Sequence, residues 1–146
     1  LNPNPEEKLM HSLILKVATR LLVGLILVFA VYLLFRGHNA PGGGFVAALV
    51  AGTGFALAAI SEGPAVVRSA IRIDPERIAM YGLGLAILCG FLGWLAGRPF
   101  LTGLWWIVTT DQSKGLAIGT PLFFDIGVFL TVLGTLLTLI LALEEN

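Results

Sequence analysis

Charged residues are scarce in this chain: they make up 12% of its 146 residues, against roughly a quarter in an ordinary soluble domain. Hydrophobic residues make up 57%, and the mean hydropathy is +0.93. Nine basic residues balance nine acidic ones, so no excess charge points to nucleic acid as a partner. The composition therefore predicts an integral membrane protein whose partners are lipid and other membrane helices.

Cysteine and histidine are also rare. Cys89 is the single cysteine, which excludes an internal disulfide and a cysteine-based metal site, and its apolar surroundings predict a small core residue. The chain shows no nucleophile paired with a base, no nucleotide-binding loop and no pair of haem ligands at helix depth. We therefore expect no enzyme activity, no metal site and no cofactor.

Four apolar stretches are long enough to cross about 30 Å of hydrocarbon as helices, which takes about 20 residues each. They cover residues 13–35, 45–61, 78–97 and 120–143. The predicted fold class is therefore all-α and integral to the membrane, with a single domain over residues 1–146 and four transmembrane helices.

Basic residues are distributed unequally between the two sides of this topology. Six share the side of both chain ends, and three lie opposite, namely Arg36, Arg98 and Lys114. Because cytosolic loops carry an excess of Lys and Arg, both termini are predicted to be cytosolic in a multi-pass protein of a bacterial or archaeal cell membrane.

Two connections are expected to form short interfacial segments. Residues 64–73 place Val67 and Ile71 beside a basic face, which predicts a short helix at the inner surface, with a solvated loop as the alternative. Residues 101–110 are apolar but too short to span the bilayer. Their adjacent Trp105 and Trp106 indicate an outer interfacial or re-entrant segment, because indole rings favour the headgroup level.

A polar, glycine-rich turn separates the first two spans. A helix cannot run through a proline followed by three glycines, so the chain must change direction here, on the outer side. Histidine titrates near neutral pH, and backbone freed by glycine could bind water or an ion, but a metal site would need more ligands. We interpret the turn as a specifically shaped connection with polar anchors for a partner, and an ion site is the alternative. Its motif residues are Gly37, His38, Asn39, Pro41, Gly42, Gly43, Gly44 and Phe45.

Small residues at four-residue spacing mark where membrane helices can approach closely. Three of the four predicted helices carry such seams, which could bury against one another or dock into a larger assembly. The candidate packing residues are Gly52, Gly82, Ala86, Gly90, Gly127, Thr131 and Gly134.

Asp125 is the one acidic residue well inside an apolar run, and intramembrane carboxylates are costly enough that the default interpretation is functional. If its helix starts at Pro121, Asp125 lies only about 6 Å along it and can hydrate from the outer surface. It projects roughly opposite the seam that starts at Gly127. We predict a role in an ion path, with pairing to an outer-side cation, pairing to a neighbouring subunit and simple hydration as the alternatives.

Two segments carry a resemblance to a known family. Residues 37–45, reading Gly-His-Asn-Ala-Pro-Gly-Gly-Gly-Phe, and residues 120–128, reading Thr-Pro-Leu-Phe-Phe-Asp-Ile-Gly-Val, resemble the MnhB family, whose members belong to Mrp-type multisubunit sodium/proton antiporters. The resemblance implies a small obligate subunit of a membrane complex that exchanges Na⁺ for H⁺ and serves pH and sodium homeostasis. Its partners would be the other antiporter subunits.

The resemblance leaves the role of this one chain open. In such complexes the large subunits carry the intramembrane lysines and glutamates expected to move protons, and this chain has no such residue at mid-membrane. It could line the cation path through Asp125 or be purely architectural. The other candidates are a small autonomous transporter and the sodium-translocating module of a membrane-bound hydrogenase or complex I-like assembly.

Overall fold

The computed structural model describes residues 5–37, 43–107 and 117–144. Four long helices dominate this part of the chain, and each is long and apolar enough to cross a membrane. The predicted all-α membrane fold with four spanning helices is confirmed. The elements, in chain order, are α1 (Pro5–Arg36), α2 (Gly44–Glu62), α3 (Pro64–Ile71), α4 (Pro75–Leu95), β1 (Trp105–Ile107), β2 (Ala117–Gly119) and α5 (Thr120–Glu144).

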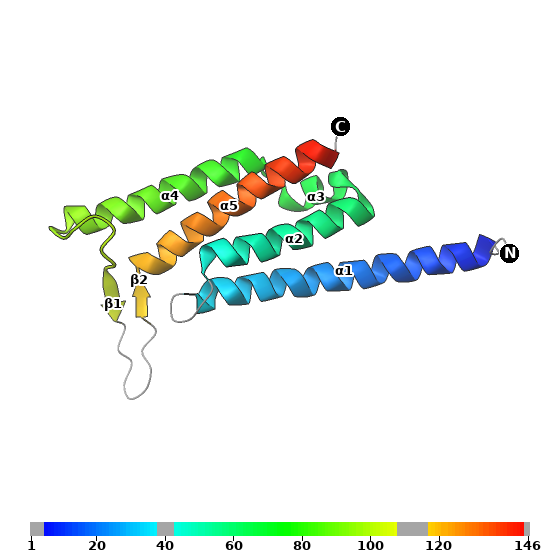
Figure 1. Cartoon of the computed structure of the whole chain (residues 1–146), viewed down its shortest axis with the longest axis horizontal. Helices are drawn as coiled ribbons and strands as arrows, with labels where there is room; N and C mark the ends of the chain where they lie inside the picture. Colours follow the sequence, from blue (N-terminus) through cyan, green and yellow to red (C-terminus); the bar gives the residue numbers. More distant parts are fainter. Residues whose placement is uncertain (1–4, 38–42, 108–116, 145–146) are drawn as a thin grey trace, which may run out of the picture.

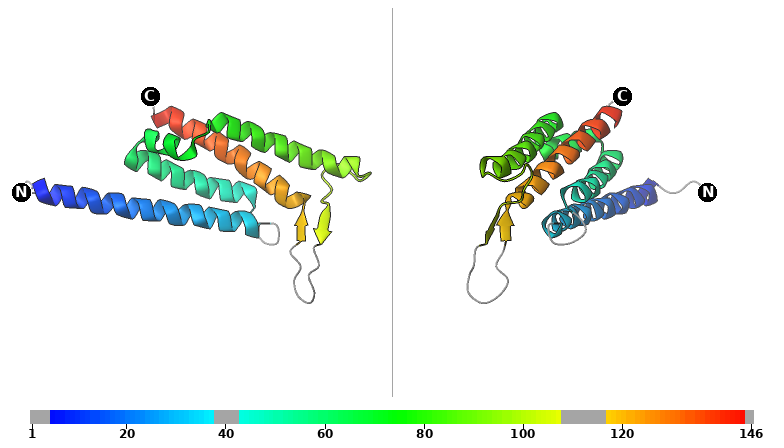
Figure 2. Two further views of the ribbon diagram at one scale, coloured as in Figure 1. Left: turned by 180° about the vertical axis from the view of Figure 1, so that it is seen from behind. Right: turned by 60° about the vertical axis from the view of Figure 1, so that its left-hand side comes forward.

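The long helices lie side by side in the order α1, α2, α5, α4 (Figures 1 and 2). The start of α1, the end of α5 and all of α3 lie at one end of the bundle, which we call the terminal end. The starts of α2 and α5 and the β1–β2 pair lie at the opposite end, which we call the hairpin end. Helix α1 forms one edge and is the least buried of the four spans.

Helix α2 is central because its packing surface is made only of small residues. Since every buried residue of α2 is Gly or Ala, the neighbouring backbones can approach closely without a hydrophobic driving force between helices. Larger side chains of α5 then fill the core from the other side. The buried set comprises Gly44, Ala47, Ala48, Ala51, Gly52, Gly54 and Ala59 of α2, with Leu133, Leu137 and Leu141 of α5.

Helix bounds differ from the expected spans mainly where polar helix formers extend a span or a glycine ends it. Helix α1 begins at Pro5 rather than near residue 13, since the residues that follow Pro5 include Glu and Lys, which favour helix. Helix α4 ends at Leu95 rather than at Gly97, because Gly97 has a φ of +72° and cannot continue a right-handed helix.

The two connections behave differently. Residues 64–71 form the short helix α3 rather than a loop, with Val67 buried and Arg68 exposed. Residues 105–107 instead form strand β1, which pairs antiparallel with β2, Trp106 lying opposite Ile118. No strand was predicted here, and the paired strands project from the helices at the hairpin end (Figure 1).

Candidate functional site

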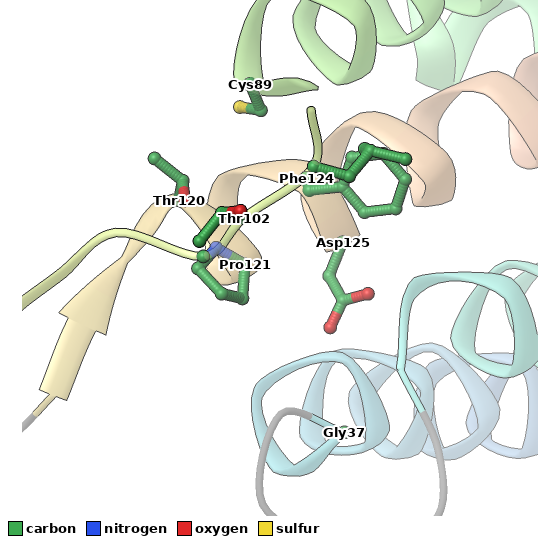
Figure 3. A pocket seen from close by; sticks show the side chains of 9 residues that line it. Gly37, Cys89, Thr102, Thr120, Pro121, Phe124 and Asp125 are labelled. Atoms are coloured by element: carbon green, nitrogen blue, oxygen red, sulfur yellow. The ribbon is translucent and has the colours of Figure 1, made fainter. Parts of the chain in front are cut away.

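Asp125 lies on the first turns of α5, partly buried, with its carboxylate pointing toward the end of α1 and the start of α2 (Figure 3). Its oxygens Oδ1 and Oδ2 lie 3.5 and 3.6 Å from where a β-carbon on Gly43 would be. The two stretches singled out in the sequence, the glycine-rich turn and the start of the last helix, therefore meet in space.

Two glycines of the turn are required by different constraints. Gly43 precedes α2 with a φ of +99°, which a residue with a side chain rarely adopts. Gly44 begins α2 directly against α5: a β-carbon there would overlap the backbone carbonyl of Asp125 and lie 3.0 Å from the amide nitrogen of Phe129. The remaining motif residues His38, Asn39, Pro41 and Gly42 lie outside the described residues, while Gly37 ends α1 and Phe45 is exposed on α2.

Within residues 5–37, 43–107 and 117–144, no side chain forms a hydrogen bond or ion pair with the Asp125 carboxylate. Of the cations considered as its partner, Arg36 lies over the Tyr32 ring at 5.9 Å, and Lys114 falls outside the described residues. The carboxylate instead faces the amino end of α2, where free N–H groups and the helix dipole carry partial positive charge.

A cavity of about 420 Å³ lies beside this carboxylate, enclosed by the ends of α1 and α4, the start of α5 and the segment after α4 (Figure 3). Its lining combines the carboxylate with hydroxyl groups and glycine backbone, which are oxygen-rich and suit a hydrated monovalent cation or water. The lining residues are Gly37, Cys89, Leu101, Thr102, Gly103, Thr120, Pro121, Phe124 and Asp125.

The cavity wall is fixed by a reciprocal pair of hydrogen bonds between Leu104 and Thr120. The amide of Leu104 donates to Thr120 Oγ1, and the amide of Thr120 donates to the Leu104 carbonyl oxygen, both at 2.9 Å. The Thr120 residue is only 5% exposed. These bonds tie the start of α5 to the segment that leads into β1.

Six of the seven predicted packing residues lie at contacts between long helices. A β-carbon on Gly82 would lie 2.5 Å from the amide nitrogen of Thr131 and 2.6 Å from the carbonyl oxygen of Gly127. One on Gly127 would lie 2.8 Å from the amide nitrogen of Ala86. The remaining two make equivalent contacts: Gly134 meets the backbone of α4 at Ala79, and Gly52 meets Leu136 of α5.

Gly90 has a different neighbour. After Leu95 the chain folds back over α4, and the Phe100 ring lies 3.0 Å from where a Gly90 β-carbon would be. Phe100 also packs edge-on against Phe91, with ring centroids 5.6 Å apart. Gly90 thus makes room for a returning segment rather than for another helix.

The sequence analysis missed an ion pair between α1 and α2. Arg20 Nη2 lies 2.6 Å from Glu62 Oε2, and Arg20 Nε donates to both carboxylate oxygens at 2.8 and 3.0 Å. The pair could have been found, because two antiparallel helices joined by a short turn bring residues equally far from the turn to the same depth.

These features define a small multi-pass membrane protein of the cell membrane, with a carboxylate-lined cavity at one end. Residues 14–138 match the family model described as a domain related to the MnhB subunit of Na⁺/H⁺ antiporters. The chain therefore belongs to the MnhB family.

Relatives of known name and structure extend this comparison. The second-lettered (B) subunit of the Na⁺/H⁺ antiporter of Alkalihalophilus pseudofirmus is 35% identical over 99% of this chain and 97% of its own length. The Bacillus subtilis protein of the same name is 36% identical over 96% of this chain and 98% of its own. In the solved structure of the Mrp complex from a Dietzia species, one chain matches with a TM-score of 0.78 and 30% identity. That match covers 99% of this chain and 15% of the Dietzia chain.

Proposed function

We propose that this chain is a non-autonomous small subunit of a multisubunit Na⁺/H⁺ antiporter, a transporter component rather than an enzyme, and that Asp125 lines the cation path. The family and the full-length similarity to the antiporter subunits of Alkalihalophilus and Bacillus support the first part. The observation that carries the second is the Asp125 carboxylate, which borders a cavity and has no partner among the described side chains.

Asp125 would act as a fixed negative charge close to one membrane surface. An intramembrane carboxylate without a protein cation is costly unless water or a mobile cation compensates it. The adjoining cavity offers room for both, and the Thr102 hydroxyl, which donates to the Pro99 carbonyl oxygen at 2.6 Å, keeps its lone pairs available to a cation or water. Na⁺ or H⁺ would thus be held briefly and passed to a neighbouring subunit.

The orientation belongs to the proposal as well. The start of α1 and the end of α5 lie at the same end of the bundle, and six of nine basic residues lie on that side. The terminal end is then cytosolic and the Asp125 cavity faces outward. A reporter fused after the last residue that is active only in the cytosol tests this.

The decisive experiment replaces the carboxylate without changing its size. In the assembled complex, Asp125→Asn is expected to lower Na⁺/H⁺ antiport in membrane vesicles at least tenfold while complex assembly is retained. Glu144→Gln, at the exposed far end of the same helix, is the matched control and should leave antiport unchanged. Full antiport in Asp125→Asn would make the subunit architectural.

The hydrogenase-type setting is tested by what the chain retains on purification. Affinity capture of this chain from its native membrane should recover membrane subunits of the antiporter only. Recovery of iron–sulfur or metal-centre subunits would place the chain in the alternative assembly instead.

A further inference from the structure

A second cavity, of about 390 Å³, lies toward the terminal end between α1, α2 and α3. Seven of its nine lining residues are apolar, and the other two are the ion pair Arg20 and Glu62. The apolar lining comprises Val23, Leu27, Phe55, Ala58, Val66, Val67 and Ala70. The site therefore combines an apolar chamber with charge at its rim.

The charge at the rim is not balanced within the chain. Glu62, whose side chain is 7% exposed, is engaged by Nε and Nη2 of Arg20, whose own side chain is 62% exposed. No described residue accepts a hydrogen bond from the remaining nitrogen, Nη1. Lys16 is exposed one helical turn earlier, and its charge acts on the same carboxylate. Two cations thus share one acid.

The depth of these cations matches a lipid headgroup. Arg36 ends α1 at the hairpin end, and Arg20 and Lys16 precede it by sixteen and twenty residues. At 1.5 Å per residue they lie about 24 and 30 Å away along the helix, while the hydrocarbon core is about 30 Å thick. Both side chains therefore reach the opposite headgroup level.

We propose that this cavity binds one anionic phospholipid, with its phosphate on Arg20 and Lys16 and an acyl chain in the apolar chamber. A guanidinium presents a planar set of donors that suits phosphate, and each cation near the surface favours an anionic headgroup. A helix of a neighbouring subunit would leave this excess positive charge without a counter-charge unless it carried an acid of its own.

The chain contains a matched cavity without charge. A pocket of about 370 Å³ between α4 and α5 is lined by apolar side chains and Thr131, and Leu83 lies in its wall. It is similar in size and should hold lipid acyl chains without selecting a headgroup.

The experiment places a photo-crosslinking benzoylphenylalanine at Phe55 in the assembled complex, reconstituted into vesicles of equal parts phosphatidylglycerol and phosphatidylcholine. A second version carries it at Val66, on α3, and a control carries it at Leu83. Intact-protein mass spectrometry after irradiation then identifies the adduct. We expect phosphatidylglycerol to exceed phosphatidylcholine about fivefold per engaged cation at Phe55 and Val66, with no preference at Leu83.

Removal of the free cation should reduce this preference. Lys16→Gln leaves the Arg20–Glu62 pair in place and is expected to lower the phosphatidylglycerol preference about fivefold. The proposal fails if Phe55 and Val66 show the same lipid ratio as Leu83. It also fails if they cross-link to another subunit, or form no lipid adduct while Leu83 does.

Discussion

Gly44, the first residue of α2, lies directly on the backbone of Asp125 in α5, with no space between them for a side chain. This contact fixes the start of α2 against the helix that carries the candidate ion-path carboxylate. It also brings the glycine-rich turn and the Asp125 cavity together as one structural unit at the hairpin end.

Gly44→Ala is expected to displace α2 from α5. The added methyl group would overlap the Asp125 carbonyl, which belongs to the backbone and cannot rotate away, so overpacking should cost about 1–3 kcal/mol. We expect a lower melting temperature of the purified complex and weaker antiport in vesicles.

Gly84→Ala is the control for Gly44→Ala, because no atom lies within 4 Å of the position its β-carbon would take. Alanine favours helix over glycine, so this variant should be neutral or slightly stabilised. Equal behaviour of the two alanine variants would show that the close approach at Gly44 is not needed.

The α4–α5 seam makes a second steric prediction. Gly82→Leu should separate the two helices, since its side chain would meet the backbone of Gly127 and Thr131, whereas Gly84→Leu, two residues along the same helix, faces open space. We expect Gly82→Leu to reduce the amount of this subunit in the membrane severalfold, measured by immunoblot, and Gly84→Leu to leave it unchanged. Similar levels of both would contradict the seam.

The composition and spacing of residues were enough to predict much of this architecture. The hydrocarbon thickness dictates the length of a spanning helix, so four apolar runs predict four helices. Gly82, Gly127 and Gly134 were identified as packing residues because only small side chains let helix backbones touch. The depth of Asp125 followed from the proline that precedes it by four residues.

Other features depend on the spatial order of the helices, which no local pattern specifies. That Asp125 faces Gly44 requires α2 to lie beside α5. Gly90 was assigned to helix packing because a small residue reveals a close neighbour but not its identity, which is Phe100. The strands β1 and β2 are three residues each, too short for a periodic signal.

The hydroxyl of Thr120 is expected to hold the cavity wall. Thr120→Val keeps the shape of the side chain but removes the acceptor for the Leu104 amide, and an unsatisfied buried donor costs about 1–3 kcal/mol. Thr120→Ser retains the acceptor and is the control. We expect a lower melting temperature of the complex for valine only; a loss of equal size in both variants would assign the effect to the methyl group.

Removal of Arg20 should harm the subunit more than removal of the whole ion pair. Arg20→Gln leaves the Glu62 carboxylate, which α2 and its neighbours largely cover, without its partner, whereas Arg20→Gln with Glu62→Gln leaves no charge behind. The double variant is therefore expected to recover part of the melting temperature and assembly lost in the single one. Additive losses would show that the two side chains act independently.

Cys89 allows the charge of the Asp125 cavity to be measured without any transport assay, because this thiol lines the same cavity and is 6% exposed. With the other subunits made cysteine-free, a cationic methanethiosulfonate should modify Cys89 about tenfold faster than an anionic one, relative to their rates with a free thiol in solution. Asp125→Asn should bring that ratio close to one, since it removes the carboxylate from the cavity wall. A ratio that is the same in both forms would mean that Asp125 does not set the potential in the cavity, and its place in the cation path would then have to be abandoned even if its replacement impaired antiport.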